Sequence, residues 1–128
     1  MVEKIKILII DDEPLIRRAL QKLFETDYYV ETAVNGIEGL KLWELLLPDI
    51  VFIDVLMPVM TGPQVIDKVK TKVRDKTKVI LMSAYEGDYN TSKMNIDLFL
   101  AKPFQDIFKV KELALALLNK EPHASSSN

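Results

Sequence analysis

The chain has 128 residues, which is enough for one domain with a substantial hydrophobic core. Its formal net charge of -2 gives no indication of a nucleic acid or an anionic membrane as a partner, and no apolar run reaches the roughly 18 residues of a membrane span. There is no cysteine and only one histidine, His123, which excludes disulfides, thiolate metal sites and histidine-based catalysis. The absence of cysteine agrees with a reducing cytoplasm, where we expect the protein to act.

Strand and helix patterns alternate along the chain. Apolar runs at residues 4–10, 29–33, 50–54, 79–82 and 97–101 predict five strands. Apolar residues recur at helical spacing after Pro14, Gly36 and Pro63, and again over residues 105–119. The polar segment 86–95 predicts at most a short helix. This alternation indicates βαβ units with right-handed crossovers, and therefore an α/β domain with a doubly wound parallel sheet.

Two of the predicted helices carry apolar residues that we expect to face the sheet. In the second helix, which is predicted to end at Pro48, these residues are Ile37, Leu40, Trp43 and Leu47. In the third helix, they are Val65, Ile66, Val69 and Val73, so one continuous helix is predicted over this stretch.

Charged residues stand at the ends of three predicted strands. Asp11 and Asp12 follow the first strand, Asp54 ends the third, and Lys102 follows the fifth. Charged groups are costly to bury alone, so they rarely end a core strand without a reason. In an open parallel sheet, the carboxyl ends of the strands form the ligand-binding edge. We therefore expect these four side chains to share one cleft.

The chemistry of this cleft is limited by its ligand types. Three carboxylates cannot all ionise within a few ångströms unless a cation offsets their repulsion. Oxygen ligands alone favour Mg²⁺, and Lys102 adds a second positive charge, which suits phosphoryl transfer. Asp54 stands alone at its strand end and is the better nucleophile candidate, whereas Asp12, with Asp11, is the better metal ligand. Ser83, at the end of the fourth strand, is a candidate hydrogen-bond donor to a phosphoryl group.

At this point the chain resembles a known family, the receiver (CheY-like) domain of two-component response regulators, over residues 4–119. The resemblance is carried by Asp11–Asp12, Asp54, Met57–Pro58, Gly62, Met82–Ser83–Ala84, Phe99 and Lys102–Pro103–Phe104, all in the family's order. It implies a flavodoxin-like (βα)5 fold with five parallel strands in the order 2-1-3-4-5, here with a shortened fourth helix region. We expect this domain to occupy residues 1–120, and residues 121–128 to be a disordered tail or the stump of a linker.

The resemblance also implies a role for each matching residue. Asp54 is expected to be the phosphoacceptor, and Asp11, Asp12 and Asp54 are expected to organise Mg²⁺ together with the backbone carbonyl of Leu56. Lys102 is expected to contact the phosphoryl group, and the Lys102–Pro103 peptide is expected to be cis. Ser83 and Phe99 match the family's pair of switch residues.

The implied function is that of a signalling module, not of a turnover enzyme. The expected partners are a sensor histidine kinase or phosphotransfer protein, and a downstream target or a missing output domain. Two departures from the family stand out: the segment between Ser83 and Lys102 is short, and Leu56 and Tyr85 are bulky residues that cannot position an attacking water. We therefore hypothesise slow hydrolysis of the phosphorylated form.

Other interpretations of the same residues compete with this one. The chain is alternatively a pseudo-receiver that acts only through protein contacts, or an aspartyl-phosphate hydrolase, although Leu56 stands where such enzymes usually carry a second acid. A flavin or nucleotide binder would need a phosphate loop where Asp11 and Asp12 would repel phosphate. Among single residues, Glu13 is interpreted as an acid of the first helical turn, and Phe99 is alternatively a simple core residue.

Overall fold

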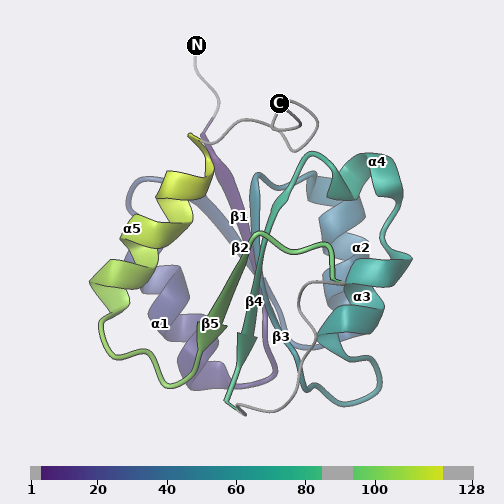
Figure 1. Cartoon of the computed structure of the whole chain (residues 1–128), viewed down its shortest axis with the longest axis horizontal. Helices are drawn as coiled ribbons and strands as arrows, with labels where there is room; N and C mark the ends of the chain where they lie inside the picture. The colour runs from purple at the N-terminus through teal and green to yellow at the C-terminus, as the bar shows by residue number, and fades with distance from the viewer. Residues whose placement is uncertain (1–3, 85–93, 120–128) are drawn as a thin grey trace.

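The computed structural model describes residues 4–84 and 94–119 (Figure 1). The strands are β1 (Lys6–Ile10), β2 (Tyr29–Ala33), β3 (Ile50–Asp54), β4 (Lys78–Ser83) and β5 (Leu98–Ala101). The helices are α1 (Pro14–Phe24), α2 (Gly36–Leu46), α3 (Gly62–Lys68), α4 (Thr71–Arg74) and α5 (Ile107–Leu117). All five predicted strands are present, and their bounds differ from the predicted ones by a residue or two at most.

The five strands form one parallel sheet in the order β2-β1-β3-β4-β5. The winding reverses at β1, because the chain goes from β1 to β2 on one side and then returns to β3 on the other. This is the doubly wound, flavodoxin-like order that was expected, so the predicted fold class is confirmed. At such a reversal the loops after β1 and β3 lead away in opposite directions and leave a crevice between them.

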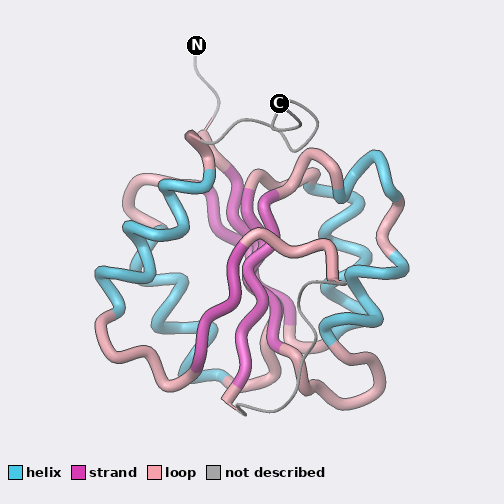
Figure 2. The backbone as a smooth tube through the Cα atoms, in the orientation of Figure 1, coloured by secondary structure: helices cyan, strands magenta, loops and turns pink. Residues whose placement is uncertain are grey.

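Helices cover both faces of the sheet (Figure 2). Helices α1 and α5 lie on one face, and α2 and α3 lie on the other (Figure 1). Side chains of β1 alternate between the two layers: Ile7 and Ile9 pack with residues of α1 and α5, whereas Leu8 and Ile10 pack with Trp43 of α2. The central strands are therefore apolar on both sides, which explains why they read as continuous hydrophobic runs. None of the helices in residues 4–84 and 94–119 is long and apolar enough to cross a membrane.

A proline in the first turn of one helix and side-chain caps on two others stabilise the starts of helices that lead away from the carboxyl edge of the sheet. Pro14 occupies the first turn of α1. The start of α3 is a capping box, in which Thr61 accepts a hydrogen bond from the backbone of Gln64 and the Gln64 side chain accepts one from the backbone of Thr61. Asp106 caps α5 by accepting hydrogen bonds from the first backbone amides of that helix. These caps hold in place the loops that flank the strand ends.

The prediction of one continuous third helix is wrong. Helix α3 ends at Lys68, because Val69 is extended (φ -65°, ψ 143°), and Val73 belongs to the separate short helix α4. The break is stabilised by a long-range contact, in which the backbone amide of Lys70 donates to Glu44 of α2. Because α4 still precedes β4, it is not the predicted short fourth helix between β4 and β5. Most of that predicted segment falls on residues 85–93, outside the described residues.

The predicted apolar face of α2 is only partly correct. Trp43 is fully buried and Leu40 is half-buried, but Ile37 and Leu47 are 45% and 53% exposed. The buried positions are instead the glycines Gly36 and Gly39. A Cβ atom on Gly39 would lie 2.7 Å from the Ile10 side chain, so the helix packs on β1 through a residue without a side chain. The short distance between α2 and β1 therefore determines which face of α2 is buried.

Candidate functional site

Of the four residues expected to share a cleft, all but the fully buried Asp11 line one pocket at the carboxyl ends of the strands. The pocket has a volume of about 230 Å³. It is lined by Asp12, Glu13, Asp54, Leu56, Ser83, Ala84 and Lys102. Asp12 and Glu13 come from the β1–α1 loop, Asp54 ends β3, Ser83 ends β4, and Lys102 follows β5. The parallel sheet thus brings four segments that are distant in sequence to one place.

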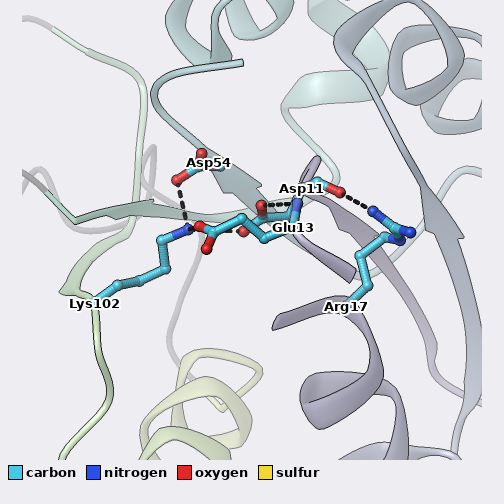
Figure 3. A network of polar contacts seen from close by, with 5 residues as sticks. All are labelled: Asp11, Glu13, Arg17, Asp54 and Lys102. Atoms are coloured by element: carbon cyan, nitrogen blue, oxygen red, sulfur yellow. Dashed lines mark hydrogen bonds and ion pairs between the residues drawn. The ribbon is translucent and has the colours of Figure 1, made fainter. Parts of the chain in front are cut away.

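Lys102 is at the centre of the polar contacts (Figure 3). Its Nζ lies 3.0 Å from Asp11 Oδ2, 3.1 Å from Asp54 Oδ1 and 2.5 Å from Glu13 Oε1. The side chain is only 4% exposed, so the ammonium group exchanges its water ligands for these carboxylates. Three carboxylates around one ammonium group match its three N–H donors. The lysine therefore links the ends of β1, β3 and β5.

Asp11 is fixed by contacts on both its side chain and its backbone (Figure 3). Its carboxylate accepts a hydrogen bond of 2.9 Å from the backbone amide of Glu13, and its backbone carbonyl accepts one of 2.8 Å from Arg17 Nη1. Its backbone amide donates to the carbonyl of Ala33 on β2. Asp11 is completely buried. It is therefore held rigidly beneath the pocket, and the more exposed Asp12 and Glu13 stand at its rim.

Asp11, Asp12 and Asp54 form a cluster that suits a hard cation. One oxygen from each carboxylate lies within 4.8 Å of the others, close enough for a shared ion. Asp11 is 0% and Asp54 5% exposed, whereas Asp12 is open to solvent. An all-oxygen set of carboxylates with one open side is typical of Mg²⁺, which keeps several waters when it binds. The residues present therefore fit a magnesium ion.

Burial and crowding of like charges shift the proton affinities of the acids. Burial, and next the negative charge of Asp11, raise the pKa of Asp54 to about 6, although Lys102 partly opposes this. Burial likewise raises the pKa of Asp11, against the effect of the hydrogen bond from Glu13. The pKa of Lys102 would fall through burial alone, but its contacts with Glu13 and Asp11 outweigh burial and raise it. The lysine is therefore firmly charged, while the site holds more negative charge than one ammonium group balances.

A close contact with Gly62 shapes the loop behind Asp54. The backbone amide of Gly62 donates to the carbonyl of Val55, which folds the β3–α3 loop back onto the strand end. A Cβ atom on Gly62 would lie 2.3 Å from the backbone carbonyl oxygen of Asp54. Only glycine fits this approach without moving the backbone of Asp54.

The structure brings together most of the residues singled out from the sequence. Asp54, Ser83 and Lys102 line one pocket, and the backbone amide of Lys102 donates to the carbonyl of Ser83. The Lys102–Pro103 peptide is cis, as the resemblance implied. Phe99 is different: it is half-buried and packs against the core cluster that contains Trp43, away from the pocket lining.

Sequence reasoning missed the part that Glu13 takes in this site. It was interpreted as an acid of the first helical turn, and it does occupy the N-cap position of α1. However, its side chain makes no capping hydrogen bond and instead contacts Lys102. The only signal in the sequence was a third consecutive acid after the first strand. Without the position of Lys102, this acid could not be distinguished from a solvated one.

The comparison with protein families decides what kind of domain carries this site. A family model described as the response regulator receiver domain matches residues 7–113. The chain belongs to this family. The resemblance drawn from the strand-end acids, Ser83 and Lys102 is therefore confirmed at the level of the family.

Receiver domains of several kinds of protein are similar to this chain. The protein-glutamate methylesterase/protein-glutamine glutaminase of Aliivibrio fischeri is 29% identical over 126 residues, which cover 91% of this chain and 32% of that protein. The transcriptional regulatory protein YdfI of Bacillus subtilis is 37% identical over 87 residues, 66% of this chain and 40% of that protein. The CheY-like receiver domain protein of Methanospirillum hungatei superposes with a TM-score of 0.83 at 26% identity, covering 91% of this chain and 95% of that structure. The chain thus spans less than half of either curated relative.

Proposed function

We propose that this receiver domain accepts a phosphoryl group on Asp54 in a Mg²⁺-dependent reaction, and that the phosphorylated form presents a changed surface to a protein partner. The observation that carries the proposal is the placement of Asp54. Its carboxylate is buried at a strand end, contacts Lys102, and shares a pocket with the carboxylate of Asp12. This is a nucleophile beside a metal-ligand set and a fixed cation.

The donor that fits the family is the phosphohistidine of a sensor histidine kinase or phosphotransfer protein. In the reaction, an oxygen of Asp54 forms the new bond to phosphorus while the bond from phosphorus to the imidazole nitrogen breaks. Asp11, Asp12, Asp54 and the backbone carbonyl of Leu56 would hold Mg²⁺, which when bound offsets negative charge on the phosphoryl oxygens. Lys102 is already charged and in place to donate to the same oxygens.

Ser83 and Phe99 are proposed to convert the new charge into a change of shape. Ser83 is a pocket-lining residue that is 3% exposed, and its hydroxyl would turn toward a phosphoryl group on Asp54. Phe99 is on the neighbouring strand β5 and is only half-buried, so a shift of its ring toward the core would remove more apolar surface from water. The surface of β5 and its flanking segments would then differ between the two forms.

This role is regulatory and involves no turnover of a separate substrate. The similar proteins include a methylesterase/glutaminase and a transcriptional regulatory protein, which are longer than this chain. We propose that the present receiver likewise acts in the cytoplasm on another domain or protein, and that its own chemistry is limited to gain and loss of the phosphoryl group. With Leu56 at the pocket, we also propose that loss is slow.

The test is incubation of the purified chain with Mg²⁺ and acetyl phosphate, followed by intact-mass measurement. A gain of one phosphoryl group in the wild type, absent in Asp54→Asn and absent when the metal is chelated, is the expected result. Asp67→Asn serves as the control, because Asp67 is an exposed acid on α3 outside the pocket lining. No mass gain with acetyl phosphate or with a phosphohistidine donor would favour the pseudo-receiver instead.

A further inference from the structure

Glu13 has a position that the proposed reaction does not use. It lines the pocket, its side chain is 55% exposed, and it ends beside the Nζ of a lysine whose own side chain is 4% exposed. Asp11 and Asp54, the other two acids on Lys102, are buried and belong to the metal and phosphoryl machinery. Glu13 is therefore the one acid on Lys102, within the described residues, that can leave by simply turning into solvent.

From this arrangement we infer that Glu13 is a positioning residue that acts as a releasable partner of Lys102 and restrains the phosphorylation of Asp54. The inference rests on the proposed function. Lys102 donates hydrogen bonds to Asp11 and Glu13 and forms an ion pair with Asp54 at 3.1 Å, so three carboxylates share its one ammonium group. A phosphoryl group on Asp54 needs a hydrogen bond from Lys102. Of the three carboxylates, Glu13 is the one whose contact with Lys102 can be broken at the smallest cost in free energy, because its side chain can move into water.

The negative charge of Glu13 should also slow the phosphorylation of Asp54. Small phosphodonors are anions, and they must enter a pocket whose rim already carries Asp12. A carboxylate at the rim repels them and also neutralises part of the lysine charge that would attract them. Removal of this one charge should therefore both free Lys102 and ease the entry of the donor.

Loop geometry explains why Glu13 reaches the lysine. Its backbone amide donates to Asp11 Oδ1, and Pro14 follows it in the first turn of α1. The backbone at Glu13 is extended (φ -87°, ψ 114°) and is held on both sides, whereas the Glu13 side chain is 55% exposed and has Lys102 as its contact. An exposed side chain on a fixed backbone suits a group that must bind and release.

The experiment compares Glu13→Gln with the wild type. Glutamine keeps the shape and the hydrogen-bonding oxygen but loses the charge. We expect the rate of Asp54 phosphorylation by acetyl phosphate, at saturating Mg²⁺ and low ionic strength, to rise by about three- to tenfold. The increase should be smaller with phosphoramidate, which carries less negative charge, and smaller again at high salt. Glu25→Gln is the matched control, because Glu25 is exposed at the opposite end of α1 and should leave the rate unchanged.

A second readout tests the contact itself without phosphorylation. In the metal-free wild type, the Lys102 ammonium protons should be protected from exchange with water in NMR spectra, and they should exchange faster in Glu13→Gln. A wild-type chain that gains no phosphoryl group overturns the proposed function, and this inference with it. A wild type that is phosphorylated, with an equal or slower rate in Glu13→Gln, overturns the inference alone.

Discussion

Gly62 packs so closely on Asp54 that a Cβ atom would lie 2.3 Å from the backbone carbonyl oxygen of the aspartate. Since both partners in this contact are backbone, neither can turn aside to make room. The β3–α3 loop therefore depends on glycine at this position, and so does the orientation of the residue that we propose to be phosphorylated.

The first prediction concerns Gly62→Ala. The added methyl group must displace the loop or the end of β3, and we expect a loss of about 2 kcal/mol in the free energy of unfolding. Urea denaturation measures this loss. Because the methyl group would press on the backbone of Asp54, the folded variant should also be phosphorylated more slowly by acetyl phosphate. An unchanged free energy of unfolding together with an unchanged phosphorylation rate would contradict the close approach of Gly62 to the backbone of Asp54.

The second prediction is the pH dependence that Asp54 imposes on the metal-free protein. Its pKa is about 6 in the folded chain, against an ordinary value of 3.8, so the folded state binds the proton more tightly than the unfolded state does. The contribution of Asp54 to stability is thus largest below pH 4 and is lost as the pH rises through 6, by about 3 kcal/mol in all.

The comparison of wild type with Asp54→Asn isolates this contribution. In the presence of EDTA, the variant should be the more stable protein at pH 7.5, and its advantage should shrink as the pH falls toward 4.5. Millimolar Mg²⁺ should stabilise the wild type more than the variant, because the variant lacks one of the three carboxylates. Equal stability of the two proteins at pH 7.5 without metal would show that the charged form of Asp54 is not destabilised by burial and by the neighbouring acids.

The charged strand ends show what could be predicted from sequence. Asp11, Asp54 and Lys102 each interrupt a pattern, because a charge directly follows an apolar run, and parallel topology then brings the ends of the strands together. Other features depend on contacts between distant residues, which the local sequence pattern does not indicate. The break at Val69 lies within regular helical spacing and is stabilised by Glu44, from another helix. The burial of Gly39 instead of Ile37 depends on how closely α2 approaches β1.

The third prediction tests Lys102 as the counter-charge of the site. Lys102→Met leaves Asp11 and Asp54 buried without a cation, so we expect a loss of at least about 3 kcal/mol in stability at pH 7.5. The loss should be smaller at pH 5, where Asp54 takes up a proton, and smaller in Mg²⁺. Lys109→Met is the control: its contact with Glu112 is at 3.5 Å between side chains that are 56% and 71% exposed, and it should change stability by less than about 0.5 kcal/mol. Equal losses in the two variants would contradict the central role of Lys102.

The fourth prediction concerns Val59, where the sequence gives no warning of an unusual backbone. This residue lies in the β3–α3 loop with φ of 72°, in the left-handed region that β-branched side chains avoid, and the amide of Met60 donates across it to the carbonyl of Pro58. Val59 is 83% exposed, so little packing offsets the strain. Val59→Gly and Val59→Asn should therefore raise the free energy of unfolding by about 1 kcal/mol.

Two comparisons make this last prediction decisive. Val34→Asn replaces another exposed valine that lies outside the left-handed region, and it should not stabilise the protein. Thermal denaturation of the three variants in EDTA compares them without any contribution from bound metal. If relief of backbone strain is the cause, Val59→Gly and Val59→Asn must both be stabilising, because the two residues share tolerance of positive φ and little else. A gain in only one of them would indicate a specific contact of the new side chain, and a loss in both would show that the valine packs better in solution than its exposure indicates.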